Sequence, residues 1–471
     1  MVDPGAPSYA QLLALIERLT VENEALRERV AELEVRLGQN SKNSSKPPSS
    51  DGLAKPAPKS LRRRSGRKPG GQNGHPGSTL AQVSDPDEVV RHEPPACAGC
   101  GGGLAGAVAV GVQRRQVFDL PPIRVRVTEH QMVTRRCDCC GATTSGAGPD
   151  GVDAPVQYGP RIAAIILYLY VGHFLSKKRT AQALAELFGT PVSGGTVAAM
   201  AARAADGLDA FIMLVRDRIA AAEVAHFDET GLRVDGKLRW VHSASAGEYS
   251  LISVHDRRGV AGMDAAGVLP GFTGIAVHDA WAPYDTYAQA THALCNAHLL
   301  RELQAVIDAT PDGQWCWATQ AADALREMKE LVDAALTDGF AALATLDAAR
   351  LAQARGVFHS AAVIGANDTK ARQTKLMAKH HALARRLINR QDDYLRFTID
   401  PRVSFDNNAA EREIRMIKLR QKVSGCLRTM TGAEQFCAIR SYLATAAKHG
   451  IHFFESLVAL AERRPWLPET A

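Results

Sequence analysis

The sequence predicts a multidomain α+β protein with an N-terminal coiled coil, a small zinc-bound β module, a helical DNA-binding region, and an α/β core with a helical insertion. Three observations predict this fold class: apolar residues at heptad spacing near the N-terminus, two CxxC pairs, and a series of apolar strands between helical stretches. A chain of 471 residues also exceeds one ordinary core and should divide into several units. The expected segments are the dimerisation helix 1–38, the basic flexible linker 39–84, the zinc-binding module 85–148, the helical region 155–222, the first part of the core 223–310, the helical insertion 311–400, the core helix 401–425 and the C-terminal helical segment 426–471.

The composition is that of a soluble globular protein, with 46% hydrophobic and 23% charged residues. No run approaches the roughly 18 apolar residues of a membrane span, so no membrane association is expected. The first residues, MVDPGAPSYAQLL, lack the basic and then apolar pattern of a secretory signal, which predicts a cytoplasmic location. The nine cysteines are then expected to be metal ligands or core residues and not disulfides.

Seven apolar side chains near the N-terminus repeat at heptad spacing: Leu12, Ile16, Leu19, Leu26, Val30, Leu33 and Leu37. With Ile16 at position a, Asn23 also falls at a and leucines fall at d, which favours a parallel dimer in a fixed register. Glu22 at g then faces Arg27 at e of the partner, and a second pair of opposite sign follows one heptad later. The pattern predicts a homodimer or higher homo-oligomer, although an amphipathic helix packed on its own chain fits it as well.

The positive charge of the chain is concentrated in one segment. The net charge is +6, and residues 41–80 alone carry nine Lys and Arg residues against the single acid Asp51. This segment is rich in Ser, Asn, Pro and Gly, so no core is expected there, and it is either a solvated linker or an arm that follows a DNA backbone, or both. The expected DNA contacts in it are Arg62, Arg63, Arg64, Arg67 and Lys68.

Two cysteine pairs predict a structural zinc site. Cys97 and Cys100 form the first CxxC pair, and Cys137 and Cys140 form the second, so four thiolates are available to one tetrahedral Zn²⁺. The extra Cys139 leaves the choice of the fourth ligand slightly open, and buried free thiols are the alternative. Alternating strands are expected to fill the gap between the pairs, over VFDLPPIRVRVTEHQMVTRR.

Residues 158–222 are typical of helices. Within them, one helix, a turn at residues 189–195 and a second helix from Thr196 have the outline of a helix-turn-helix. Lys177, Lys178 and Arg179 are placed to meet phosphates in that arrangement, although any two packed helices with a glycine turn would look similar.

Two apolar strands each end in a carboxylate. The run 224–227 ends at Asp228 and Glu229, two more strands and a short connection follow, and a fourth strand, 274–277, ends at His278 and Asp279. This is the strand order of a ribonuclease H-like core, in which the first and fourth strands lie side by side. A turn residue explains one such acid, but two acids at the same sheet edge indicate a site.

A later helix is expected to supply a third carboxylate. In SFDNNAAEREIRMIKLRQK, Glu411 is three residues before Ile414 and shares its face, which predicts that Glu411 points toward the core. Its neighbour Glu413 is expected to be solvated. An acid in the first turn that complements the helix dipole is the alternative for Glu411.

Three carboxylates suit hard divalent cations such as Mg²⁺ or Mn²⁺, which take oxygen ligands. Two such ions about 3.5 to 4 Å apart can act on both the attacking and the leaving oxygen of a phosphodiester. The acids therefore predict a phosphodiester-cleaving or phosphodiester-transferring site with two metal ions.

Long motifs across nearly the whole chain give it a family resemblance. They are SKNSSKPPSSDG, GRKPGGQNGHPG, the paired cysteines, FDET, VHDAWAPY, NAHLLREL and DNNAAEREIR. In these the chain resembles the transposases of the insertion sequence 66 family, within the class that uses an Asp, Asp, Glu triad. The resemblance implies Asp228, Asp279 and Glu411 as catalytic residues. It also implies cleavage and strand transfer of an element's DNA ends into target DNA, with accessory proteins of the same element as possible partners.

Other residues near these motifs have weaker interpretations. Cys295 and His298 form a CxxH pair for which packing is the first expectation, with His298 a possible contact of the active site or of a phosphate. Trp281 and Tyr284 suit either base stacking or core packing. The basic residues that follow Glu411 suit phosphates or an ordinary solvated face, and they are Arg412, Arg415, Lys418, Arg420 and Lys422.

Two other functions fit part of the pattern. A zinc-containing DNA-binding regulator with a catalytically silent core needs only the zipper, the basic arm, the zinc module and the helix-turn-helix. A nuclease that hydrolyses DNA without joining it would use the same acids.

Overall fold

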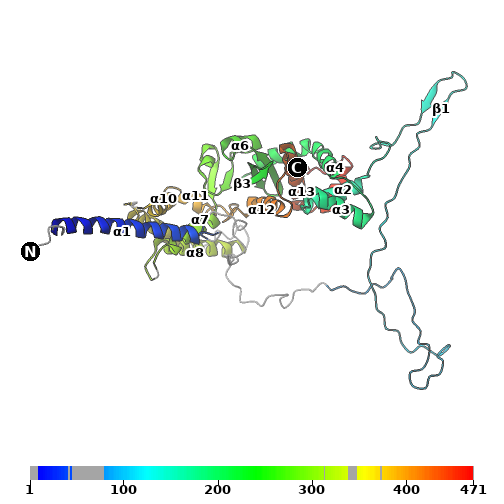
Figure 1. Cartoon of the computed structure of the whole chain (residues 1–471), viewed down its shortest axis with the longest axis horizontal. Helices are drawn as coiled ribbons and strands as arrows, with labels where there is room; N and C mark the ends of the chain where they lie inside the picture. The colour runs from blue at the N-terminus through cyan, green and yellow to red at the C-terminus, as the bar shows by residue number, and fades with distance from the viewer. Residues whose placement is uncertain are drawn as a thin grey trace, which may run out of the picture.

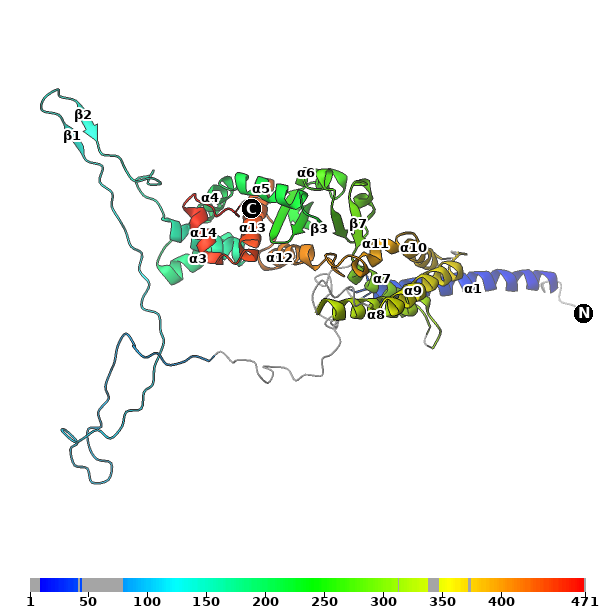
Figure 2. The same ribbon diagram turned by 180° about the vertical axis from the view of Figure 1, so that it is seen from behind.

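The computed structural model describes residues 9–40, 43–44, 79–311, 313–337, 347–371 and 374–469 as a mixed α+β protein. A five-stranded sheet lies among helices that come from both earlier and later parts of the chain, and the zinc-module segment extends away from it (Figure 1, Figure 2). Most of the predicted basic linker lies outside the described residues, including Arg62, Arg63, Arg64, Arg67 and Lys68.

The central sheet has the strand order β5-β4-β3-β6-β7. The first three strands along the chain pair antiparallel, whereas β6 is parallel to β3 and β7 is parallel to β6. The predicted adjacency of the first and fourth strands is therefore confirmed. The bounds are β3 Val224–Val234, β4 Lys237–Ala246, β5 Tyr249–His255, β6 Ile275–His278 and β7 Thr291–Leu294.

Local sequence explains the hairpin and the crossover of this sheet. The β3–β4 hairpin turns at Asp235 and Gly236, both with positive φ, as expected for an Asp-Gly turn. Between β5 and β6 the chain forms helix α6, Val260–Ala266, and a short 3-10 turn, where a helical or irregular connection is predicted.

Helices α5 (Asp209–Ala220) and α13 (Met430–Lys448) pack against β5, the strand at one edge of the sheet. The backbone N–H of Ile252 donates to the Ser441 hydroxyl at 2.8 Å, and the N–H of Ser250 donates to that of Thr445 at 3.1 Å. These hydroxyls accept hydrogen bonds from backbone N–H groups of the edge strand β5, which would otherwise be free to pair with another strand.

Helix α12, Asn408–Ser424, packs against β3 and β4. The remaining helices that contact this part of the fold are α2 (Pro160–Leu167), α3 (Lys177–Phe188), α4 (Gly194–Asp206) and α14 (Phe453–Ala461), with a π-helical turn at Tyr168–Gly172. The predicted helix-turn-helix outline is present. Gly189 ends α3 in the left-handed conformation, and the Ser193 hydroxyl caps α4, which begins two residues earlier than predicted.

The described helices between Asn296 and Leu395 pack around a second apolar core, and those from Trp317 onward lie within the predicted helical insertion 311–400. This core includes Trp317, Phe358 and Tyr394. Gly365 lets two of these helices approach closely, because a Cβ there would lie 2.4 Å from the Trp317 ring. The helices are α7 (Asn296–Asp308), α8 (Trp317–Thr337), α9 (Ala348–Asp368), α10 (Lys375–Asn389) and α11 (Gln391–Leu395).

Helix α1, Tyr9–Gly38, covers the predicted heptads. Its seven heptad residues are all exposed, from 41% at Leu33 to 83% at Leu37, so in the described part of the chain this apolar stripe is not covered. Packing of the helix on its own chain is therefore not observed.

The zinc-module segment forms less sheet than predicted. The sequence predicts strands across residues 117–136, but only the last three of these residues belong to one, β1 (Thr134–Arg136), which pairs with β2 (Thr143–Ser145). This expectation was wrong because alternation by itself supplies no hydrogen-bonding partner for a strand. Among the described residues, no helix has both the length and the apolarity needed to cross a bilayer.

Candidate active site

Strand β3 sends its two adjacent acids to opposite faces of the sheet. Successive side chains in a strand alternate, so Asp228 shares a face with His226, and Glu229 shares the other with Phe227. His226 contacts Asn407, which directly precedes α12. Asp228 therefore belongs to the face that α12 covers.

Asp279 directly follows β6 and lies beside Asp228 of the parallel strand β3. The expectation that the first strand ends at Asp228 was wrong, because β3 continues through the acid to Val234 in its pairing with β4. The paired residues of β3 and β6 end with His226 opposite Val277, and two more residues along each strand place Asp228 opposite Asp279. Neighbouring strands lie about 4.8 Å apart, so these carboxylates are close. Ala280 follows in the left-handed conformation, with φ 66°, and the Trp281 N–H donates to Asp279 Oδ1 at 3.0 Å. This turn ends the strand directly at the acid.

Glu411 comes from the first turn of α12, which Asn407 fixes to the sheet. The buried Asn407 side chain donates to the Phe227 carbonyl at 2.7 Å, and its oxygen lies 3.1 Å from His226 Nδ1. Its backbone N–H also donates to Cys295 Sγ at 3.2 Å. Asn407 thus joins β3, α12 and the start of α7. Sequence reasoning missed this role, because the partners of Asn407 come from distant segments of the chain.

Basic side chains lie close to Glu411. Its carboxylate lies 3.1 Å from the Arg415 guanidinium, 3.8 Å from that of Arg301 and 3.7 Å from His298 Nδ1. Only 14% of the Glu411 side chain is exposed, as predicted from its position beside the apolar stripe. His298 therefore lies beside the carboxylate of Glu411.

Electrostatics indicate that the three acids act on one another. Burial raises the pKa of Asp228 well above its ordinary value, and the charges of Glu229, Asp279 and Glu411 raise it further. The pKa of His298 is lowered, first by burial and then by Arg301, against the opposing effect of Glu411 and Asp279. Asp228 accepts a hydrogen bond from the Glu229 N–H at 2.9 Å. Neither Asp228 nor Asp279 forms an ion pair with any described residue, so the carboxylate charge is left for an external cation.

Glu229, in contrast to Asp228, has side-chain partners within the protein. Its buried carboxylate accepts hydrogen bonds from Arg258 at 2.7 Å and from the Tyr284 hydroxyl at 2.6 Å. The Arg258 guanidinium in turn lies 3.8 Å from the Trp281 ring centroid. Tyr284 is 2% exposed, which confirms packing, and not base stacking, for that residue.

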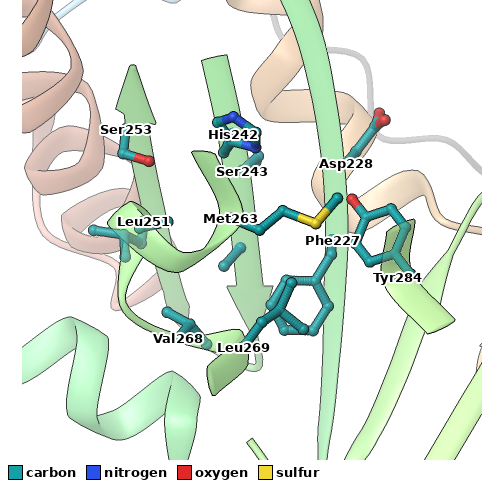
Figure 3. A pocket seen from close by; sticks show the side chains of 12 residues that line it. Phe227, Asp228, His242, Ser243, Leu251, Ser253, Met263, Val268, Leu269 and Tyr284 are labelled. Carbon is teal, nitrogen blue, oxygen red and sulfur yellow. The ribbon is translucent and has the colours of Figure 1, made fainter. Parts of the chain in front are cut away.

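A small cavity of about 20 Å³ lies on the Phe227 side of β3. It is the size of one water molecule. Figure 3 shows that the Asp228 carboxylate points away from Phe227 and Met263, while the Tyr284 hydroxyl points toward β3. The cavity is therefore a gap in the packing, and the Asp228 carboxylate points away from the residues that line it.

The expectation for Glu413 was wrong. Its side chain is buried and faces Arg440 of α13 at 4.0 Å, whereas a solvated charge was predicted. Helix periodicity could not anticipate this contact, because Arg440 comes from a different helix. Arg420 is likewise buried at 4% exposure and donates to the Gly425 carbonyl, so it is not part of a basic surface.

The predicted phosphate contacts on α3 and α12 differ in exposure. Lys178, Arg179 and Arg415 are exposed, whereas Lys418 is half-buried and donates to the Gly231 carbonyl at 2.6 Å. Lys177 lines a groove of about 300 Å³ between α4 and the start of α13. Burial and the nearby charges of Arg428 and Arg420 lower its pKa. Arg179 also donates to the Val423 carbonyl and Arg415 pairs with Glu411, so both guanidinium groups have partners within the protein although their side chains are exposed.

Each CxxC pair forms the same tight turn. The Gly101 N–H donates to the Cys97 carbonyl at 2.8 Å, and the Gly141 N–H donates to that of Cys137 at 2.9 Å. In both turns, backbone N–H groups near the first sulfur lower its pKa. The four sulfurs of Cys97, Cys100, Cys137 and Cys140 are not brought together, however. Of the described residues, only Cys295, His298 and Glu411 group three metal-ligating atoms.

Comparisons with known proteins place the chain in a family. The profile of the transposase IS66 family matches residues 155–435, more than half of the chain and the whole span from α3 to α12. The zinc-finger binding domain of transposase IS66 matches residues 94–141, which include both CxxC pairs, so structural zinc is supported. A family of unknown function matches residues 2–81, and no curated protein matches the chain. The chain belongs to the transposase IS66 family.

Proposed function

We propose that this transposase cleaves DNA at the ends of its insertion sequence and joins them to target DNA, with Asp228, Asp279 and Glu411 as catalytic carboxylates. The observation that carries the proposal is the convergence of Asp228 in the middle of β3, Asp279 at the end of β6 and the first turn of α12 on one face of the sheet. The strand order, with three antiparallel strands followed by two parallel ones, supports a ribonuclease H-like core.

The donor set fits hard divalent cations. Asp228 and Asp279 have no ion-pair partner among the described residues, and Asp228 is buried beside other negative charges. Asp228, Asp279 and Glu411 would hold two Mg²⁺ or Mn²⁺ ions, which when bound activate the attacking oxygen and stabilise charge on the leaving oxygen. The rest of the chain orients these acids. Asn407 fixes α12 to β3, and Arg258 together with Tyr284 holds Glu229 on the opposite face.

The same proposal includes the other partners of the chain. Lys178, Arg179 and Arg415 are exposed and suit phosphates of the terminal repeats or the target. Cys97, Cys100, Cys137 and Cys140 would hold one Zn²⁺ once their two turns meet. The exposed stripe of α1 supports a coiled-coil dimer or higher oligomer that acts in the cytoplasm, where the DNA lies.

The test compares single acid variants on a labelled DNA fragment that carries both element ends, with a second label on the target. Asp228→Asn, Asp279→Asn and Glu411→Gln should each lower Mg²⁺-dependent nicking more than about 100-fold, because each removes a direct metal ligand. DNA affinity should change little. Asp323→Asn, an exposed acid of α8, is the matched control and should keep wild-type activity.

The outcomes separate the three functions. Nicking with transfer of label to the target supports the transposase, whereas nicking with release of free ends alone indicates a nuclease. If wild type and Asp228→Asn bind DNA equally and neither nicks it, the chain is a DNA-binding regulator and the proposal fails.

A further inference from the structure

We propose that Cys295, His298 and Glu411 form a second metal site, for a thiophilic divalent cation such as Zn²⁺. One ligand atom from each of these three residues lies within 4.8 Å of the other two. Glu411 belongs to both this site and the carboxylate cluster, whereas Cys295 and His298 belong only to this one. The site therefore differs from the Asp228–Asp279 pair in ligand chemistry while sharing one residue with it.

The start of α7 positions the first two ligands. Cys295 is the residue that precedes the helix, and His298 lies three residues later, so both side chains fall on the same face of the first turn. The backbone N–H of Asn407 donates to Cys295 Sγ at 3.2 Å. A sulfur that accepts a backbone N–H at a helix N-terminus is suited to bind a metal as thiolate. Burial raises the pKa of this thiol to about 12 in the metal-free protein, so an incoming ion has to displace the proton.

His298 supplies the second observation, independent of the cysteine. Its Nδ1 atom is buried and has no hydrogen-bond partner among the described residues. The same nitrogen lies 3.7 Å from Glu411 Oε1, which is too long for a hydrogen bond. Two ligands of one tetrahedral Zn²⁺, with bonds of about 2.0–2.2 Å, lie roughly 3.3–3.6 Å apart. A cation between them would satisfy the buried nitrogen with only a small shift of the side chains.

The donor set selects the kind of ion. One sulfur, one imidazole nitrogen and one carboxylate oxygen suit Zn²⁺, whereas Mg²⁺ prefers oxygen ligands alone. The thiolate and the carboxylate together balance the charge of a divalent ion. Arg415, whose side chain is 61% exposed, is free to turn into solvent when the ion takes its place at Glu411.

A consequence, which rests on the proposed function, concerns control of the active site. Glu411 bound to Zn²⁺ beside Cys295 and His298 is less available to the ions held by Asp228 and Asp279. Zinc at this site should therefore oppose Mg²⁺-dependent cleavage. Binding itself does not depend on the proposed function and is tested without DNA.

The experiment measures metal binding by the full-length protein. Wild type, Cys295→Ala and His298→Ala are stripped with chelator and reloaded with Zn²⁺ in the presence of excess Mg²⁺, and bound zinc per chain is determined by elemental analysis. Wild type should hold one equivalent more than either variant, since the CxxC module is unchanged in all three. Co²⁺ reloading should show a matching loss of thiolate-to-metal absorption in both variants, because an ion that is not bound beside Cys295 contributes no such band.

Controls separate a lost ligand from a damaged fold. Cys437→Ala removes another buried cysteine, 1% exposed and in α13, and should keep the wild-type zinc content. Glu411→Gln keeps the shape of the third ligand and should weaken the additional zinc at least about tenfold. Circular dichroism must show the same helix content in each variant that is scored. Wild-type zinc content and an unchanged cobalt spectrum in folded Cys295→Ala and His298→Ala would overturn the proposal.

The regulatory consequence has its own readout. Each variant's nicking rate with zinc is divided by its own rate without zinc, both in Mg²⁺. This ratio should be about 0.1 or lower for wild type and Cys437→Ala, because zinc slows their nicking at least about tenfold. It should stay near one for Cys295→Ala. An equal fall in all three means that zinc acts elsewhere, and a chain that binds the additional zinc but never nicks DNA refutes the proposed function and leaves the metal site intact.

Discussion

At the scale of single residues, two adjacent acids have opposite roles because a strand alternates its side chains. Glu229 accepts hydrogen bonds from Arg258 and Tyr284, which oppose the increase of its pKa caused by burial and by Asp279, while Asp228 faces α12 and the other carboxylates of the site. Burial and those neighbouring charges raise the pKa of Asp228, so the folded, metal-free protein favours its protonated form. The arrangement holds Asp228 ready for a cation at a cost in stability.

We predict that Asp228→Asn stabilises the metal-free protein at neutral pH. A raised folded-state pKa contributes stability that is present below the unfolded pKa of about 3.9 and lost as pH rises through the folded value. The variant should therefore melt a few degrees above wild type at pH 7, with a difference that shrinks as the pH falls toward 4. Thermal unfolding in chelator at several pH values measures this. Equal midpoints at pH 7 would contradict the expected charge repulsion.

The adjacent variant should have the opposite sign. Glu229→Gln removes the charged partner of Arg258 and weakens the bond from Tyr284, and it should lower stability by about 1–3 kcal/mol at neutral pH. The same unfolding series measures it. If Asp228→Asn and Glu229→Gln both stabilise the protein, the bonds from Arg258 and Tyr284 do not offset the cost of burying the Glu229 charge.

Asn407 is a positioning residue for Glu411. Asn407→Ala removes a buried side chain that bonds to the Phe227 carbonyl and His226, and should cost about 2–4 kcal/mol of stability. It should also raise the Mg²⁺ concentration for half-maximal nicking about tenfold or more, since a support of a metal ligand is lost. Asn408→Ala is the control, because that exposed side chain bonds only to its neighbour Asp406. If Asn407→Ala and Asn408→Ala need the same Mg²⁺ concentration for half-maximal nicking, Asn407 does not position Glu411.

At the scale of elements, contacts between helices decide what each helix can tolerate. Helix α9 contains two glycines, and only one of them touches another helix. A Cβ at Gly365 would lie 2.4 Å from the Trp317 ring of α8, whereas a Cβ at Gly356 would meet nothing within 4 Å. The close approach of α8 and α9 therefore depends on one missing methyl group.

Alanine at these two positions should change stability in opposite directions. Gly356→Ala should add about 0.5–1 kcal/mol, because alanine has the higher helix propensity. Gly365→Ala should remove about 1–3 kcal/mol, because the tightly packed Trp317 ring must move. Denaturant unfolding of the two variants checks this. A gain at both positions would mean that α8 and α9 are not in close contact.

At the scale of the whole molecule, α1 presents an apolar stripe with no partner in the described part of the chain. The stripe follows heptads, whereas the exposed Val21 lies outside it. A second copy of the same helix would bury the stripe and bring two catalytic cores together. Two cores would suit an element that has two ends.

We predict that Leu19→Ser weakens self-association. Each chain loses one leucine from the seam, so the dissociation constant should rise roughly 100-fold or more. Val21→Ser, at another exposed apolar position but outside the seam, should leave it unchanged. Light scattering across a concentration series measures both. A monomeric wild type at every concentration would refute the coiled coil.

Local patterns in the sequence were sufficient for the helices and for the candidate acids, but not for the strands of the zinc-module segment. Helical periodicity predicted the helices of the insertion and α12, and the ends of two apolar runs by themselves indicated Asp228 and Asp279. Each CxxC pair was recognisable from its spacing, and each forms a tight turn. These features are encoded over a few residues, within reach of backbone geometry and side-chain period.

Only the tertiary structure decided how these features meet. It pairs Glu413 with Arg440, joins Asn407 to β3, and brings Cys295 and His298 to Glu411, more than a hundred residues away in sequence. Strand alternation sends Asp228 and Glu229 to opposite faces, but only the tertiary structure decides that α12 covers the face of Asp228 and that Arg258 and Tyr284 meet Glu229 on the other. Such contacts depend on the packing of segments far apart in the chain, and no local period carries that information.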